Sequence, residues 1–197
     1  MKIEHLILGV YQTNSYVVRH DDCLDCVIID TGLEAEDLMD YLAENGLNPV
    51  ALVLTHGHVD HIVGAEELKA KYPDIRVYIH KADAEMLTEP DLNLSAMAGS
   101  AFRTHRADRV IDEPYTIEEA GIRLEVLHTP GHTKGGICLY CREEGVVFSG
   151  DTLFADSVGR TDLGGGSMAE LIRSIHDKLL VLPDDTLVYP GHGPETV

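Results

Sequence analysis

The feature that most constrains this chain is a short string of potential metal ligands, Thr55-His56-Gly57-His58-Val59-Asp60-His61. His56 and His58 are two positions apart, so an extended backbone places both imidazoles on one side. Asp60 and His61 then open a predicted helix and can turn toward a neighbouring point. A polar turn with incidental histidines would need a rare coincidence, even with 11 histidines among 197 residues. The string therefore predicts two adjacent metal sites, each receiving two ligands.

Three further residues of ligand type, His132, Asp151 and His192, each lie in a glycine-containing loop that follows a predicted strand. The string of ligands itself comes after the apolar run Val50–Leu54 in the same way. Ligand sites in α/β sheets lie beyond the carboxyl ends of strands, so these four loops can meet in one crevice. Glycine lets such loops turn tightly and leaves space beside a bound metal.

Predicted strands and helices alternate along the chain, and no linker, repeat or break in composition divides it. We expect a first strand in the N-terminal segment and further strands at Asn14–Arg19, Cys26–Asp30, Val50–Leu54, Val77–Ile79, Arg123–Leu127, Ile137–Cys141, Val146–Ser149 and Leu187–Tyr189. We expect helices at Glu34–Glu44, Asp60–Lys71, Lys81–Leu87 and Met168–Leu180. The irregular segment Asn93–His105 is long enough to suggest a function. The alternation predicts an α/β layer fold in one domain, residues 1–197.

The charge balance excludes some classes of partner. The chain carries 15 basic and 34 acidic side chains and a formal net charge of -19. Nucleic acid or an anionic membrane would be repelled by this surface, so neither is expected as a partner. The N-terminus lacks a basic region followed by a long apolar run, and no apolar stretch approaches membrane-spanning length. We therefore expect a cytoplasmic protein.

The four cysteines form two pairs with Cys-x-x-Cys spacing, Cys23/Cys26 and Cys138/Cys141. Such pairs can form a structural zinc site when a tight turn separates the two thiols. Here both pairs lie wholly or partly in predicted strands, where an offset of three points the side chains to opposite faces. We expect small core residues or free thiols in a reducing compartment.

Taken together, these residues resemble the full ligand set of the metallo-β-lactamase superfamily, and the resemblance extends over nearly the whole chain. It implies that one metal is held by His56, His58 and His132, that a second is held by Asp60, His61 and His192, and that Asp151 bridges both. Asp30 matches an early acidic position that steadies the site in this family. The implied fold is a four-layer αββα sandwich with the site along one edge, between the two sheets.

The resemblance also narrows the branch of the family. The best-known lactamases carry a cysteine in place of Asp151, so β-lactam hydrolysis is disfavoured. The glyoxalase II branch shares the bridging aspartate, Leu153-Phe154 and the closing Pro190-Gly191-His192-Gly193. Glyoxalase II proper continues into a helical domain that holds glutathione, whereas this chain ends soon after His192. The segment Gly159-Arg160-Thr161-Asp162 is similar to short bacterial glyoxalase II-like proteins and also to persulfide dioxygenases.

The branch implies a binuclear hydrolase that cleaves thioesters, such as S-lactoylglutathione or a related small-molecule acyl-thiol. Two metals that share Asp151 would lower the pKa of a bridging water to near neutrality, and the resulting hydroxide would attack the thioester carbonyl. Asp60 and Asp151 are the expected catalytic residues. Zinc is the expected metal, although a His/Asp set without thiolate also accepts iron or manganese. The alternatives are a mononuclear iron persulfide dioxygenase and a non-catalytic metal-binding module.

Specificity must come from groups outside the metal ligands, and Arg160 is the nearest candidate. Its guanidinium could bind a carboxylate on the thiol portion of the substrate. It could instead form an ion pair with Asp162 or Asp156. The residues leave the acyl group, the thiol and the oligomeric state open.

Overall fold

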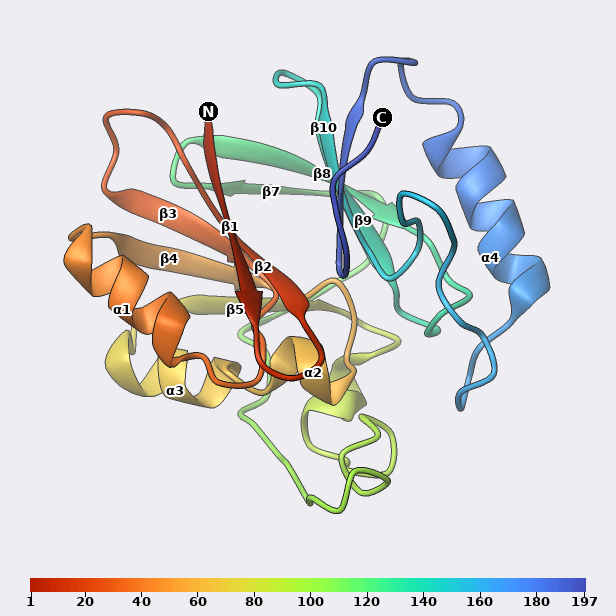
Figure 1. Cartoon of the computed structure of the whole chain (residues 1–197), viewed down its shortest axis with the longest axis horizontal. Helices are drawn as coiled ribbons and strands as arrows, with labels where there is room; N and C mark the ends of the chain where they lie inside the picture. Colours follow the sequence, from red (N-terminus) through yellow and green to blue (C-terminus); the bar gives the residue numbers. More distant parts are fainter.

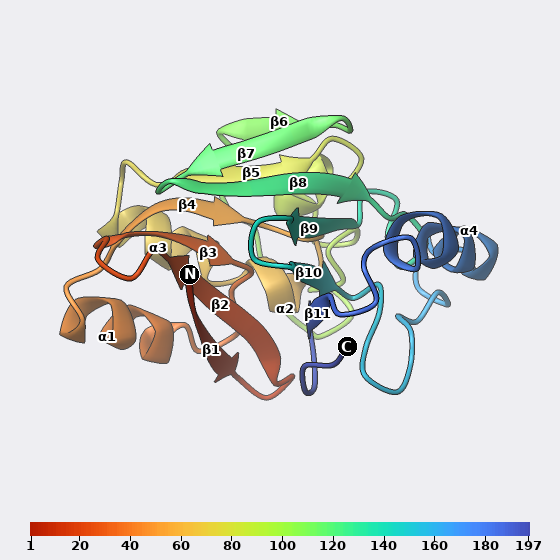
Figure 2. The same cartoon turned by 90° about the horizontal axis from the view of Figure 1, so that it is seen from above.

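The fold consists of two mixed β-sheets packed face to face, with helices on both outer faces (Figures 1 and 2). A computed structural model describes residues 1–197. The first sheet has the order β1-β2-β3-β4-β5-β6, with strands Lys2–Leu8, Thr13–Arg19, Asp25–Ile29, Asn48–Val53, Arg76–His80 and Arg109–Ile111. The second has the order β11-β10-β9-β8-β7, with strands Leu187–Pro190, Val146–Gly150, Ile137–Cys141, Ile122–His128 and Tyr115–Glu119.

The strands from β3 to β6 run parallel to one another, whereas β1 and β2 are antiparallel additions at the edge of the first sheet. In the second sheet, only the β10–β11 pair is parallel. The helices are α1 (Glu36–Glu44), α2 (Val59–Ile62), α3 (Ala65–Lys71) and α4 (Met168–Ser174). A 3-10 helix, Ala84–Leu87, follows β5, and a π-helical segment, Ile175–Leu179, continues α4.

Three apolar clusters fill the spaces between the four layers. The central cluster lies between the two sheets and includes Val53 and Phe148. A second cluster packs the first sheet against α1 and α3, and a third packs the second sheet against α4 through Leu171. Successive residues of β4 point into different clusters, Val53 inward and Leu52 toward the helices. This arrangement confirms the αββα fold and explains why β4 is a continuous apolar run.

Helix α1 is held in the outer layer by burial of its apolar side chains and not by a side-chain cap at its start. Leu38 and Leu42 are four residues apart and fully buried, whereas no side chain caps the helix start. Each buried leucine contributes about 1.5–3 kcal/mol relative to an exposed one. The predicted start at Glu34 is two residues early, because Glu34 has φ of 60° and cannot continue a right-handed helix.

Other predicted elements differ from the structure in identifiable ways. The predicted helix Asp60–Lys71 is two helices, which are interrupted around Gly64. A Cβ at Gly64 would lie 2.7 Å from Ala35 Cβ, so close packing against the start of α1 accompanies the break. The first strand expected in the N-terminal segment is β1, whereas β6 and β7 were not predicted. The segment Asn93–His105 is irregular, as predicted.

The cysteines of the second pair lie on opposite faces of β9. Cys138 is in the cluster beneath α4, and Cys141 is in the cluster between the sheets. All four cysteines are free thiols. The prediction of core cysteines is confirmed for Cys26, Cys138 and Cys141, which are buried, whereas Cys23 is partly exposed. None of the helices combines the length and apolar character needed to cross a membrane.

Candidate metal centre

The loops that follow β4, β8, β10 and β11 meet at one edge of the sandwich. The β4 loop carries His56 and His58 and leads into α2, which carries Asp60 and His61. The other three loops supply the remaining candidates, so all seven residues singled out as ligands from the sequence lie in one cluster: His56, His58, Asp60, His61, His132, Asp151 and His192.

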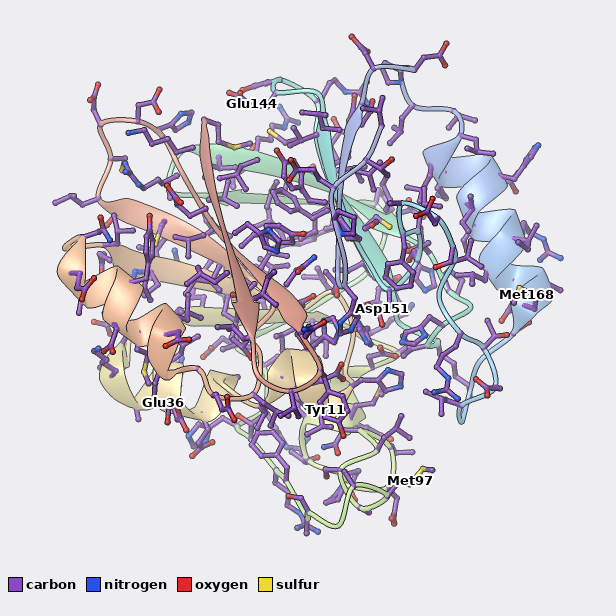
Figure 3. The ribbon with its side chains drawn as sticks, viewed as in Figure 1. Tyr11, Glu36, Met97, Glu144, Asp151 and Met168 are labelled. Atoms are coloured by element: carbon purple, nitrogen blue, oxygen red, sulfur yellow. The ribbon has the colours of Figure 1, made fainter.

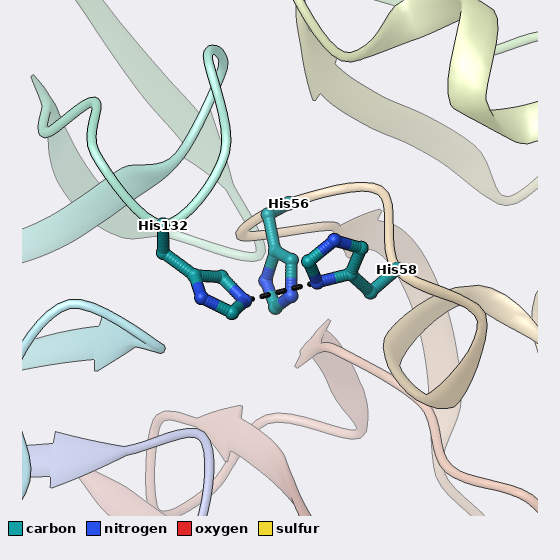
Figure 4. A group of neighbouring side chains, drawn as sticks. All are labelled: His56, His58 and His132. Atoms are coloured by element: carbon teal, nitrogen blue, oxygen red, sulfur yellow. Dashed lines mark hydrogen bonds between the residues drawn. The ribbon is translucent and has the colours of Figure 1, made fainter. Parts of the chain in front are cut away.

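Three buried histidines form the first group. The ligand atoms of His56, His58 and His132 all lie within 4.8 Å of one another. Figure 4 shows the three imidazoles converging from two separate loops, with His58 Nδ1 and His132 Nε2 2.9 Å apart. His132 donates its Nδ1–H to the carbonyl of Arg160 at 2.7 Å, so its Nε2 carries a lone pair. That lone pair is directed at the centre of the group.

Asp60, His61 and His192 form the second group, again with ligand atoms within 4.8 Å. The Nε2 atoms of His61 and His192 are 3.2 Å apart, and His192 Nε2 is 3.3 Å from Asp60 Oδ2. His61 donates its Nδ1–H to Asp30, so Nε2 is the ring nitrogen available to a metal. The group thus presents a carboxylate and two imidazoles to one point.

Asp151 lies between the two groups. Its Oδ2 is 3.5 Å from His132 Nε2, and its Oδ1 is 3.5 Å from His61 Nε2. Oδ1 also belongs to a buried set of possible ligands with His56 and His61. One carboxylate therefore faces both groups, one oxygen toward each, which is the geometry required of a bridge.

Two properties of this cluster fit a pair of divalent cations. Buried polar atoms are normally hydrogen-bonded, yet His56 Nε2 and Asp151 Oδ1 have no partner in the protein. Burial also lowers the pKa of His58 to about 3 and that of His56 well below its usual value. Both imidazoles are therefore neutral at physiological pH, which is the form that binds a metal. Nitrogen and oxygen donors without thiolate suit zinc, iron or manganese.

Asp30 holds the second group in place through a hydrogen bond with His61, which is the kind of role that the resemblance to the family implied. It accepts hydrogen bonds from the Thr55 amide at 2.7 Å, the Thr55 hydroxyl at 2.6 Å and His61 Nδ1 at 2.8 Å. Burial opposes a charge on His61, but Asp60, Asp30 and Asp151 outweigh it and raise its pKa to about 10 in the metal-free protein. Asp30 thus fixes both the orientation and the tautomer of His61.

Arg160 lies beside the centre, but its charge is already paired. The guanidinium is 63% exposed and donates two hydrogen bonds to Asp162, at 2.7 and 2.8 Å. This is the ion pair that the sequence offered as an alternative to substrate binding. Its backbone has a separate part to play, because the Arg160 carbonyl orients His132.

Asp83 is a supporting residue that sequence reasoning missed. This buried carboxylate accepts hydrogen bonds from the Gly57 amide, the Thr133 hydroxyl and the Gly135 amide, at 3.2, 2.7 and 2.7 Å. Burial raises its pKa, although these three bonds oppose the shift. Asp83 joins the loop of His56 and His58 to the loop of His132. A signal was available, since Asp83 follows β5 as the ligands follow their strands.

Gly191 shows why a glycine precedes the last histidine. A Cβ at this position would lie 2.3 Å from Asp151 Oδ1 and 2.9 Å from His61 Cε1. Any side chain here would displace the carboxylate between the two groups. The prediction that glycine keeps space open beside the metals therefore has a specific basis at Gly191.

The centre opens into a cleft of about 570 Å³. Five of the candidate ligands line it, together with Arg160 and several apolar residues from the β1–β2 turn, the segment after the 3-10 helix and the loop after β10. The volume is in the range of clefts that bind small organic molecules. The two candidate metal-binding groups therefore lie at the floor of a cleft that a small molecule can enter.

The sequence profile of the metallo-beta-lactamase superfamily matches residues 8–192. The chain is 42% identical to the probable metallo-hydrolase YqgX of Bacillus subtilis over 197 residues, covering 100% of this chain and 92% of the relative. It is 36% identical to the hydroxyacylglutathione hydrolase GloC of Haemophilus influenzae, with 100% and 92% covered. The chain therefore belongs to the metallo-beta-lactamase superfamily.

Two solved structures are also closely similar. The BLEG-1 B3 metallo-beta-lactamase is 40% identical, with a TM-score of 0.95 over 99% of this chain and 93% of that one. TTHA1623 in a di-iron-bound form is 37% identical, with a TM-score of 0.82 over 98% and 94%. The family relation and the His/Asp cluster make this chain a metal-binding hydrolase.

Proposed function

We propose that this protein is a binuclear metal-dependent hydrolase that cleaves thioesters, with S-lactoylglutathione or a related acyl-thiol as substrate. The position of Asp151, facing both ligand groups, is the single observation that carries the binuclear part. The relation to a hydroxyacylglutathione hydrolase supports the thioester part. One metal would be held by His56, His58 and His132, and the other by Asp60, His61 and His192.

Two divalent ions at this site would supply an activated water and polarise the substrate carbonyl. The residues of this chain would hold the metal-binding groups in the positions that such chemistry requires. Asp151 and Asp60 would offset part of the charge of the ions, and Asp151 lies between the two groups. Asp30 and the Arg160 carbonyl hold the imidazoles of His61 and His132 in position. A preorganised set of this kind does not have to reorganise during the reaction.

A thioester suits this cleft because of its leaving group. Thiols have a pKa near 8.5, so a thiolate departs without being protonated first. The carboxylates in the cleft, Asp60 and Asp151, are both in the metal-binding cluster. Neither is free to donate a proton to an alkoxide or amine leaving group.

Metal content is the first test of this proposal. We expect about two first-row ions per chain after reconstitution, measured by elemental analysis, with zinc as the main metal and iron or manganese as possible replacements. A reproducible content of one iron per chain, with oxygen-dependent turnover of a persulfide, would instead favour a mononuclear dioxygenase using His56, His132 and Asp151. A metal-loaded chain that turns over no substrate would favour a non-catalytic metal-binding module.

The second test concerns substrate and Arg160. We expect hydrolysis of S-lactoylglutathione with weak binding and little discrimination among thiols. Arg160→Ala should raise KM by about 10-fold and leave kcat nearly unchanged if Arg160 exchanges Asp162 for a substrate carboxylate. Asp162→Asn is the matched control, because it frees the guanidinium and should lower KM. An unchanged KM in both variants would show that the ion pair between Arg160 and Asp162 only stabilises its own loop and that Arg160 does not bind the substrate.

One comparison favours a second candidate function, hydrolysis of β-lactams, because a B3 metallo-beta-lactamase has nearly the same fold over nearly the whole chain. A chromogenic cephalosporin assayed beside the thioesters decides between them. Thioester turnover that exceeds cephalosporin turnover by kcat/KM supports the main proposal, and the reverse order would replace it with the second.

A further inference from the structure

Apolar side chains line the cleft beside the metal centre, and two of the largest, Tyr11 and Met97, are exposed to solvent. We call Tyr11, Leu94, Met97, Ala98 and Phe154 the apolar wall. Met97 is 78% exposed and Tyr11 is 50% exposed. In Figure 3, both lie below Asp151, Tyr11 on the β1–β2 turn and Met97 on the segment that follows the 3-10 helix. Exposed apolar groups gathered beside a reactive centre mark a binding surface.

The segment that carries Leu94, Met97 and Ala98 is hydrogen-bonded to helix α2 of the metal centre through Asn93. Asn93 is fully buried, and its carbonyl accepts a hydrogen bond from the Val59 amide at 2.9 Å, at the first residue of α2. Its side-chain amide donates to the Met86 carbonyl at 2.8 Å. The next residue, Leu94, has φ of 69°, a left-handed conformation that is unfavourable for leucine. Backbone strain of this kind persists only where the surrounding structure holds the residue in place, and it is common at functional sites.

The cleft lining offers few charged side chains outside the metal-binding cluster to hold the polar parts of a substrate. Arg160 is the only lysine or arginine in the lining, and Asp162 already pairs with it. The whole chain has a formal net charge of -19. A glutathione thioester carries two carboxylates and one ammonium group, and apart from the metals it would find at most one cation in the cleft lining.

We infer that the apolar wall binds the acyl part of the substrate, and that the enzyme prefers thioesters with a longer apolar acyl chain to acetyl thioesters. This inference rests on the proposed thioester hydrolysis and names its substrate class. Glutathione thioesters are then accepted but bound weakly. The wall acts on substrate affinity, and the metal centre acts on the bond that is broken.

The test is a series of acyl thioesters of one uncharged thiol, N-acetylcysteamine, with acetyl, butyryl, hexanoyl and octanoyl chains. A methylene that is fully buried improves binding about 3- to 4-fold. Because the wall is open on one side, we expect kcat/KM to rise at least about 10-fold from acetyl to hexanoyl.

Two variants with the same substitution locate the effect. Met97→Gln keeps the length of the side chain and adds polarity to the wall. It should lower the hexanoyl-to-acetyl ratio of kcat/KM about 3-fold through the KM of the hexanoyl substrate, with metal content unchanged. Met168→Gln is the control, because Met168 is also an exposed methionine but lies at the start of α4, outside the cleft lining. It should leave the ratio unchanged.

The possible outcomes distinguish a failure of this inference from a failure of the proposed thioester hydrolysis. Cleavage of acetyl and hexanoyl thioesters at equal kcat/KM would overturn the inference and leave thioester hydrolysis standing. An unchanged ratio in Met97→Gln would also overturn it, because the preference would then come from elsewhere. If the metal-loaded enzyme cleaves no thioester, the proposed function fails and this inference fails with it.

Discussion

Replacing Asp151 with alanine is expected to remove at least one metal ion per chain and nearly all hydrolysis, with the fold retained. Asp151 is the only carboxylate that faces both ligand groups, at 3.5 Å from His61 Nε2 and 3.5 Å from His132 Nε2. Without it, two dications would face each other in a buried site with one fewer counter-charge. An uncompensated buried charge costs about 3–5 kcal/mol, which corresponds to at least about 100-fold weaker metal binding.

Asp151→Asn is the sharper version of this experiment, because it keeps the shape of the side chain and removes only its charge. Metal content by elemental analysis, kcat/KM on a thioester and circular dichroism should be measured together. Asp156→Asn is the matched control, since Asp156 is an exposed aspartate five positions along the same loop. Full metal content and activity in Asp151→Asn would contradict the bridging role.

The layers of the fold follow from patterns that the sequence displays directly. The continuous apolar run of β4 requires cover on both faces, and Leu38 and Leu42 mark the buried stripe of α1. The two strands that were not predicted, β6 and β7, lack such patterns. β7 buries only Ile117 and pairs only with β8, and three-residue β6 occupies the edge of its sheet. Pairing with a neighbour defines such short edge strands more than any property of their own residues does.

The same contrast holds at the metal centre. The candidate ligands could be found from the sequence because side-chain chemistry, spacing and position after a strand all point to them. The roles of Asp83 and the Arg160 carbonyl could not be found in this way. A backbone carbonyl has no signature in the sequence, and Asp83 acts on residues 26 and 52 positions away. Only the folded chain shows which loops it joins.

Asp83→Ala is expected to weaken the three-histidine group selectively. Asp83 bonds to Gly57, between His56 and His58, and to Thr133, next to His132, but makes no hydrogen bond to the residues of the second group. The variant leaves two buried amides and a hydroxyl without an acceptor, so the two loops lose their common anchor. Loss of a group that orients metal ligands typically costs about 10- to 100-fold in metal affinity or activity.

Competition with a metal-binding indicator measures the two affinities, and the expected result is one tight and one weakened site in place of two tight ones. Thr133→Val should give a smaller loss of the same kind, and Thr133→Ser should restore it, because only the hydroxyl bonds to Asp83. Asp74→Asn, at an exposed position, serves as the control. A purely structural role would lower the melting temperature of the metal-free protein while leaving both affinities intact, and equal weakening of both sites would refute the selectivity argued from these contacts.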